Sequence, residues 1–227
     1  MKHLVRMALL VLACSAGALG AQEEGISRVM GAIRVEAGQH TGNVATVNGS
    51  VNIGENAVVG RASTVNGSVS LAPGAHAASV SSVNGAIHLG AHGQVEGSIH
   101  TVNGALQLEE GSDVGGDLQN VNGNIQVKAS HIGGGIETLN GSIELGPDAH
   151  VDGTVTVDHS SCGWIQALFG CDGSFSSVPH IIIGPGCVVR GTLRFKREVR
   201  LYVSDRAQIG PVEGATIQRF KGDSPPL

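Results

Sequence analysis

The sequence predicts an all-β protein, a single-stranded, three-sided parallel β-helix with about 18 residues per coil. Two observations lead to this fold class. A Val-Asn-Gly motif recurs at nearly constant spacing, and aliphatic residues recur about every six residues between successive motifs. A third observation is the lack of bulk, because the 227 residues include 35 glycines and only six aromatic side chains. Such a composition can fill only a narrow core of aliphatic side chains.

The first twenty residues have the pattern of a secretory signal. Two basic residues precede a short apolar run, and small residues follow. This order is typical of a signal peptide, residues 1–20, cleaved between Gly20 and Ala21. The alternative is a lipoprotein anchored at Cys14. In either case we expect export to the periplasm or cell envelope, or secretion, and we find no transmembrane segment in the later sequence.

The repeat occupies residues 21–157. Its motifs are Val29-Met30-Gly31, Val47-Asn48-Gly49, Val65-Asn66-Gly67, Val83-Asn84-Gly85, Val102-Asn103-Gly104, Val121-Asn122-Gly123 and Leu139-Asn140-Gly141. An alternating aliphatic pair follows each motif: Ile33/Val35, Val51/Ile53, Val69/Leu71, Ile87/Leu89, Leu106/Leu108, Ile125/Val127 and Ile143/Leu145. Alternation with period two predicts strands with one face inward. Glycine supplies the corners, where a positive φ or tight packing is needed. The general preference for right-handed crossovers favours right-handed winding.

Six asparagines should stack on one corner of this coil, one per turn. They are Asn48, Asn66, Asn84, Asn103, Asn122 and Asn140. Carboxamides about 4.8 Å apart can hydrogen-bond along a stack, so we interpret the column as a structural ladder. A repeated ligand-binding edge is the alternative. A neighbouring column is expected to face outward, where it could form a lattice-matching surface: Thr46, Thr64, Ser82, Thr101, Asn120 and Thr138.

Candidate reactive residues are few. Asp113, His131 and His150 share one column on successive coils and are a candidate metal site; the alternative is an exposed corner that accepts any polar residue. Cys162 and Cys171 with His159 or His180 are a second metal candidate. We assign no catalytic residue and no cofactor. A hexapeptide-type acyltransferase would use His88, His92 or His100, but nothing in the sequence distinguishes one of them. A polysaccharide-degrading β-helix would need clustered acids and aromatic platforms, and the repeats contain no aromatic residue.

The C-terminal third differs in charge and composition. Residues 21–160 carry 4 basic and 14 acidic side chains, whereas residues 161–227 carry 8 and 5, with all six aromatics. We expect an inserted loop at 158–179, final coils at 180–210 and a tail or cap at 211–227. The net charge of −5 disfavours nucleic acid as a partner.

The insert and the basic residues after it are the candidate partner surface. Cys162 and Cys171 are close enough in sequence to form a disulfide in an oxidising compartment, and Cys187 should be buried and unpaired. The residues of this surface are Trp164, Phe169, Phe175, Arg190, Arg194, Lys196, Arg197 and Arg200. A disulfide-stapled flap and a set of salt bridges to the acidic repeats are the structural alternatives.

Units such as Ile183-Gly184-Pro185-Gly186 and Val189-x-Gly191-x-Leu193 resemble the bactofilins, which are polymer-forming bacterial proteins. The tandem V-N-G-x-I units also resemble putative-adhesin β-helix proteins of bacteria. The resemblance covers roughly Val29 to Leu193. It implies a three-sided, right-handed β-helix and, for bactofilins, end-to-end polymerisation without nucleotide. Bactofilins are cytoplasmic, whereas this sequence carries an export signal.

These observations favour a non-enzymatic, exported envelope protein that acts as a structural scaffold or an adhesin-like binding surface. The expected partners are an envelope protein, a polysaccharide or an anionic lipid surface. The first alternative is a self-assembling, bactofilin-like polymer, a homo-oligomer formed through the helix ends, because open ends of a β-helix present unpaired strand edges. The second is the acyltransferase.

Overall fold

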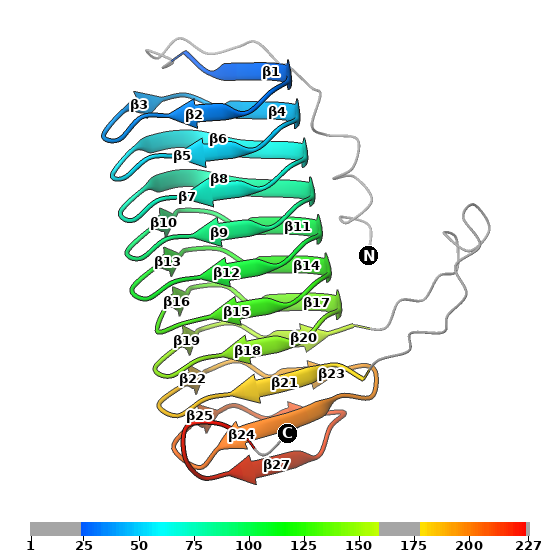
Figure 1. The fold of residues 1–227 in the computed structure, drawn as a ribbon. Helices are drawn as coiled ribbons and strands as arrows, with labels where there is room; N and C mark the ends of the chain where they lie inside the picture. Colours follow the sequence, from blue (N-terminus) through cyan, green and yellow to red (C-terminus); the bar gives the residue numbers. More distant parts are fainter. Residues whose placement is uncertain (1–23, 159–177, 226–227) are drawn as a thin grey trace, which may run out of the picture.

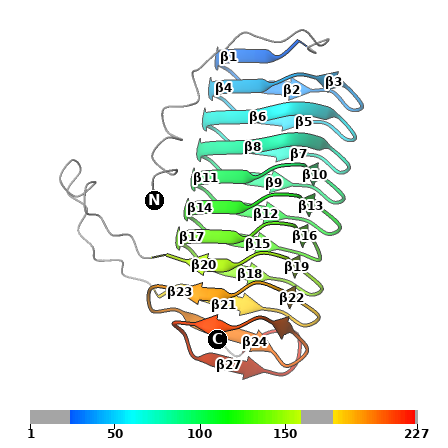
Figure 2. The ribbon, with the colours of Figure 1, turned by 180° about the vertical axis from the view of Figure 1, so that it is seen from behind.

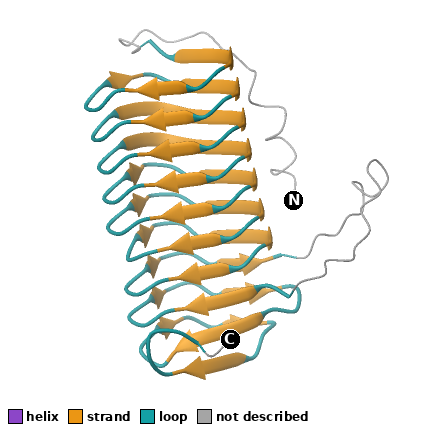
Figure 3. Cartoon of the chain, in the orientation of Figure 1, coloured by secondary structure: helices purple, strands orange, loops and turns teal. Residues whose placement is uncertain are grey.

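The chain folds as a parallel β-solenoid of about ten turns. A computed structural model describes residues 24–158 and 178–225, and these residues contain no helix (Figure 3). Figures 1 and 2 show the stack from opposite sides, with the N-terminal coil at one end and the C-terminal coil at the other. Most coils contribute three strands, one to each side, as the sequence predicts.

One side of the solenoid is a sheet of ten parallel strands. Its strands, in spatial order, are β2 (Ile33–Val35), β5 (Val51–Ile53), β7 (Val69–Leu71), β9 (Ile87–Leu89), β12 (Leu106–Leu108), β15 (Ile125–Val127), β18 (Ile143–Leu145), β21 (His180–Ile183), β24 (Arg200–Ser204) and β27 (Ile217–Phe220). Inward positions are buried and the residues between them are outside, as alternation predicts.

The other two sides form one continuous sheet of 17 strands. The second side consists of β3 (His40–Thr41), β10 (Gln94–Val95), β13 (Asp113–Val114), β16 (His131–Ile132), β19 (His150–Val151), β22 (Val188–Val189) and β25 (Gln208–Ile209). The third side consists of β1 (Ile26–Met30), β4 (Val44–Asn48), β11 (Ile99–Asn103), β14 (Leu118–Asn122), β17 (Ile136–Asn140), β20 (Val155–Val157), β23 (Leu193–Phe195) and β26 (Val212–Glu213). Two long strands, β6 (Val58–Asn66) and β8 (His76–Asn84), run through both sides.

The strands pair in register, so equivalent residues of successive coils lie side by side. Asn84, for example, lies opposite Asn66 on one neighbouring coil and Asn103 on the other. In Figure 1 the near strands β5, β7 and β9 run leftward and the chain returns rightward behind them as it descends, which is right-handed winding.

The core is a single column of aliphatic side chains along the axis. Each alternating pair after a Val-Asn-Gly motif is buried, and so are the second aliphatics Val59, Val95, Val114, Ile132 and Val151. Among the described residues, buried aromatic side chains occur only in the last coils, as Phe195, Tyr202 and Phe220. The narrow bore explains why the repeats exclude aromatics.

Two corners use glycine for different physical reasons. At the Val-Asn-Gly corner successive coils are too close for a side chain, since a Cβ on Gly85 would lie 2.0 Å from the carbonyl oxygen of Gly67. At the corner after each aliphatic pair the backbone adopts a positive φ, and Gly38, Asn56 and Gly74 take that position in turn. Only the second corner therefore accepts residues other than glycine.

The threonine column lies inside the solenoid, which corrects the expectation that it faces outward. Thr46, Thr64, Ser82, Thr101, Asn120 and Thr138 are all buried. The bore tolerates these polar groups because most of them bond to backbone carbonyls, as in the 2.9 Å bond that Thr64 Oγ1 donates to the oxygen of Gly49. Consequently the valine of each Val-Asn-Gly motif faces outward.

The solenoid continues further than the sequence indicates. The segment 211–227, expected as a tail or cap, contributes β26 and β27, and β27 pairs with β24. Phe220 on β27 is buried in the last coil. The expected insert at 158–179 falls between β20 and β21, and its residues 159–177 lie outside the described residues.

Candidate functional site

A shallow pocket of about 330 Å3 lies on the third side of the solenoid, over β14, β17 and β20. It forms where the corner before the third side becomes wider. Two residues separate the inward Ala77 and Val80 on β8, whereas three separate Val95 from Ile99 in the next coil. The added residue splits the long strand into two, and glycines occupy the widened corner. The run Gly133–Gly135 leaves the gap without side chains.

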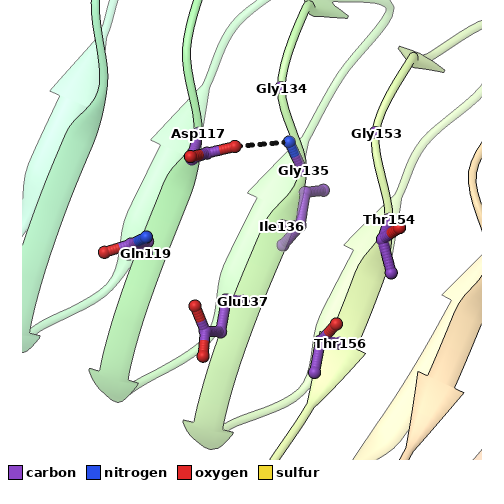
Figure 4. A pocket seen from close by; sticks show the side chains of 9 residues that line it. All are labelled: Asp117, Gln119, Gly134, Gly135, Ile136, Glu137, Gly153, Thr154 and Thr156. Atoms are coloured by element: carbon purple, nitrogen blue, oxygen red, sulfur yellow. Dashed lines mark hydrogen bonds between the residues drawn. The ribbon is translucent and has the colours of Figure 1, made fainter. Parts of the chain in front are cut away.

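Polar groups surround this gap (Figure 4). The pocket is lined by Asp117, Gln119, Gly134, Gly135, Ile136, Glu137, Gly153, Thr154 and Thr156. Asp117 Oδ1 accepts a 2.7 Å hydrogen bond from the backbone N–H of Gly135. The carboxylate of Glu137 has no hydrogen-bond partner among the described residues. The arrangement suits weak polar contacts with a solute, and it contains no nucleophile paired with a base.

His100 lies one coil from the pocket, in register with Gln119. Burial lowers the pKa of His100 below its ordinary value of 6.5, and the hydrogen bond with Gln119 only partly offsets this. Its Nδ1 is buried and has no hydrogen-bond partner in the part of the chain that the structure describes. The other two histidines considered for acyl transfer lie elsewhere, His88 on β9 of the ten-stranded sheet and His92 at a positive-φ corner. The structure therefore does not bring the three together.

The metal candidate is only partly assembled. Asp113 and His131 are in contact, with His131 Nδ1 2.6 Å from Asp113 Oδ1. His150 turns away and bonds through Nδ1 to the carbonyl oxygen of Asp148 at 2.9 Å. His131 Nε2 instead lies 3.1 Å from Asp152 Oδ2, and Asp152 Oδ1 accepts a 2.7 Å bond from Arg190. Acidic and basic side chains therefore alternate along the corner. They follow one another instead of converging on one point, as metal ligands must. Within residues 24–158 and 178–225, no three His, Cys, Asp or Glu side chains could hold a metal ion.

The carboxylates of Asp113 and Asp152 are expected to raise the pKa of His131. Hydrogen bonds to Asp113 and then to Asp152 raise the pKa of His131 above 6.5. Protonated His131 should stabilise the fold below about pH 6.5, and that stabilisation should be lost as pH rises through the folded-state pKa. Its size should not exceed about 1 kcal/mol, since the pairs are exposed. We expect NMR titration of the His131 ring to give a midpoint above 6.5 that falls in Asp113→Asn. The same midpoint in Asp113→Asn and wild type would contradict this assignment, and Glu110→Gln serves as control.

The asparagine column forms a continuous ladder of amide hydrogen bonds. Each Nδ2 donates to the Oδ1 of the preceding coil, at 2.9 Å from Asn66 to Asn48 and at 3.0 Å from Asn140 to Asn122. The bonds between these two ends are 2.9 to 3.0 Å long. Since every amide has the same orientation, the ladder has a free donor end at Asn48 and a free acceptor end at Asn140.

Arg197 caps the acceptor end. Its Nη1 lies 2.7 Å from Asn140 Oδ1 and 3.2 Å from the carbonyl oxygen of Leu139. Register explains the contact, because Thr138 pairs with Val157 and Val157 pairs with Phe195, so Arg197 occupies the asparagine column two coils later. The guanidinium thus reaches across the coil from which the insert departs. Its positive charge lies at the oxygen end of the aligned amides, where it interacts favourably with their dipoles.

Removing this cap should destabilise the solenoid locally. We expect Arg197→Gln to reduce the free energy of unfolding by about 1–2 kcal/mol, because a charged donor is lost from a half-buried acceptor. Urea denaturation followed by circular dichroism measures the change. Arg200→Gln is the matched control, since Arg200 is exposed on β24 and its side chain bonds to none of the described residues. Equal effects of both substitutions would count against the cap.

The remaining basic residues of the expected partner surface are mostly paired with acids. Salt bridges of 2.7 to 2.9 Å join Arg190 to Asp152, Arg194 to Glu213 and Lys196 to Asp158. These basic side chains therefore pair with acidic side chains on the solenoid surface, which is the salt-bridge alternative given above.

The cysteines and aromatics of the insert fall in undescribed sequence. Cys162, Cys171, Trp164, Phe169 and Phe175 lie outside the described residues. Cys187 is free and fully buried, and burial raises its pKa to about 11. It is consequently unreactive at neutral pH.

Sequence reasoning missed the pocket, the cap and the role of Asp152. The run Gly133–Gly135, unique among the repeats, was the available signal for the pocket. The chain matches no protein-family model, no curated protein and no solved structure. In the described residues, no helix has the length and apolar character to cross a membrane.

Proposed function

We propose that this chain is a non-enzymatic, exported protein of the cell envelope, in which a stiff solenoid acts as a scaffold or presents a binding surface. The observation that supports this most is the asparagine ladder. Five successive amide bonds and the Arg197 cap connect seven coils along the outside of the molecule, parallel to the backbone ladders. Side chains committed to such bonds stabilise a shape rather than a reaction centre.

Two measurements test this proposal. After expression of the full chain in a Gram-negative host, we expect the protein in the osmotic-shock fraction. Its mass should be that of a mature chain whose first residue is Ala21 or a lipidated Cys14. Hydrogen exchange should show uniformly strong protection of the central strands β8 to β17. Retention of the intact chain in the cytoplasmic fraction, or fast exchange throughout these strands, would overturn the proposal.

End-to-end assembly is the second candidate, favoured by the N-terminal end. Strand β2 is at the edge of its sheet, and β1 carries Val29 and Met30 with 71% and 77% of their surface exposed. Exposed strand edges with apolar side chains pair readily with other chains. Sedimentation velocity over a wide concentration range distinguishes the two candidates. Filaments support assembly, whereas a monomer at every concentration excludes it.

A further inference from the structure

One outer edge of the solenoid repeats with little variation, Leu139 and Met30 being its two departures. It consists of a column of aliphatic residues, Val29, Val47, Val65, Val83, Val102, Val121 and Leu139, beside the column Met30, Asn48, Asn66, Asn84, Asn103, Asn122 and Asn140. We name these two columns the valine–asparagine edge. The adjacent outward row of the same strands varies freely, with Ala45, Ser63, Ser81, His100 and Gln119 in successive coils. Packing in the core does not explain why one outward position stays nearly constant while the outward position beside it varies.

The aliphatic column is accessible to solvent. Val29 and Met30 are the two large apolar side chains of the described residues that are most exposed, and both belong to this edge. The following valines are partly exposed, and the edge ends at Leu139 and Asn140, where Arg197 covers the ladder. Contiguous exposed apolar surface with a polar border commonly marks an interaction site.

The ladder still offers hydrogen bonds to a partner. Each carboxamide has two N–H donors and two acceptor lone pairs, and the ladder uses one of each per residue. One donor and one acceptor per coil therefore remain directed toward solvent, at a repeat of about 4.8 Å. The edge thus presents an apolar contact and an amide pair at every step.

Size and charge exclude other occupants. Seven coils give a strip about 34 Å long and no more than about 10 Å wide. This is roughly 300 Å2, well below the ~800 Å2 per partner of a stable protein interface. Residues 21–160 carry 14 acidic and 4 basic side chains, so an anionic lipid surface is repelled. A thin, uncharged, linear polymer is compatible with this edge.

We propose that the valine–asparagine edge binds a neutral, β-linked, N-acetylated polysaccharide, an inference that rests on the proposed role as a binding surface. In a β-1,4-linked polymer of this class successive sugars are related by a half-turn, so the acetamido groups on one side face every second coil of the edge. Its acetamido groups complement the free amide donors and acceptors, and the C–H faces of its rings contact the valines. The acetyl group distinguishes this ligand from other neutral glycans.

Co-sedimentation of the full chain with insoluble chitin tests the proposal, with cellulose as the polymer that lacks acetamido groups. We expect binding to chitin in preference to cellulose, and release by soluble N-acetylglucosamine oligomers but not by glucose oligomers. The triple variant Val83→Thr, Val102→Thr, Val121→Thr keeps β-branched side chains and should bind about ten-fold more weakly. The matched control is His88→Thr, Gln107→Thr, Gln126→Thr, on the outward row of the ten-stranded sheet in neighbouring coils.

Circular dichroism melting of each variant establishes that it is folded. Should the triple variant unfold, the double variant Val29→Thr, Met30→Thr replaces it, because these residues are the most exposed on the edge. Absence of chitin binding, equal binding to both polymers, or equal loss in the control variant would overturn the proposal. Concentration-dependent dimers that the triple variant abolishes would instead assign the edge to a second copy. None of these results affects the export and exchange measurements, so failure here leaves the scaffold proposal standing.

Discussion

Gly85→Ala should reduce the free energy of unfolding by about 3 kcal/mol or more, the largest effect we expect from one methyl group. A Cβ at this position would lie 2.0 Å from the carbonyl oxygen and 2.4 Å from the carbonyl carbon of Gly67, both backbone atoms of the preceding coil. Neither atom can move without separating strands that pair in register on both sides. Urea denaturation of wild type and variant measures the difference.

Gly146→Ala is the matched control for this prediction. A Cβ there would be 3.1 Å from the oxygen of Val127, a distance that a small shift relieves. We expect its cost to stay below about 1 kcal/mol, because alanine also restricts the unfolded chain. Similar losses in both variants would mean that the Val-Asn-Gly corner is not held by close backbone approach.

Leu106→Ala should cost about 2–5 kcal/mol. The side chain is fully buried on β12 and lies between Ile87 and Ile125 of the neighbouring coils. The bore cannot collapse around the cavity, since the coil spacing is fixed by backbone hydrogen bonds on all three sides. Thermal and urea unfolding both report the loss.

Gln107→Ala on the same strand provides the comparison. Gln107 is exposed between Leu106 and Leu108, so its truncation should change stability by less than about 0.5 kcal/mol. If Leu106→Ala is as mild as Gln107→Ala, the aliphatic column is not the main source of stability. A large effect of Leu106→Ala alone confirms that the narrow core stabilises the stack.

Much of the fold could be predicted because the same sequence pattern occurs in every copy of the repeat. The spacing of the Val-Asn-Gly motifs predicted the coil, and the alternation in pairs such as Val51/Ile53 predicted the strands whose inner faces are buried. The asparagines follow from the same spacing, since residues one coil apart must be neighbours in a parallel stack. These are local patterns repeated along the chain, and each copy supports the others.

The candidate sites were less predictable because they depend on departures from the repeat. Arg197 reaches Asn140 across 57 residues of sequence, which no local pattern indicates. His150 shares the column of Asp113 and His131, yet its side chain bonds to Asp148. Column membership fixes where a Cα lies, whereas the rotamer depends on the nearest hydrogen-bond partner.

The sequence by itself determined the coil, its register and the composition of its core, because a period of 18 or 19 residues admits few other ways to bury alternating aliphatics. Only the tertiary structure decided which face of the strands on the third side of the solenoid points inward. Both of its rows are compatible with a sheet, and the threonines enter the bore because their hydroxyls bond to glycine carbonyls of the preceding coil. That choice places the valines outside and creates the valine–asparagine edge.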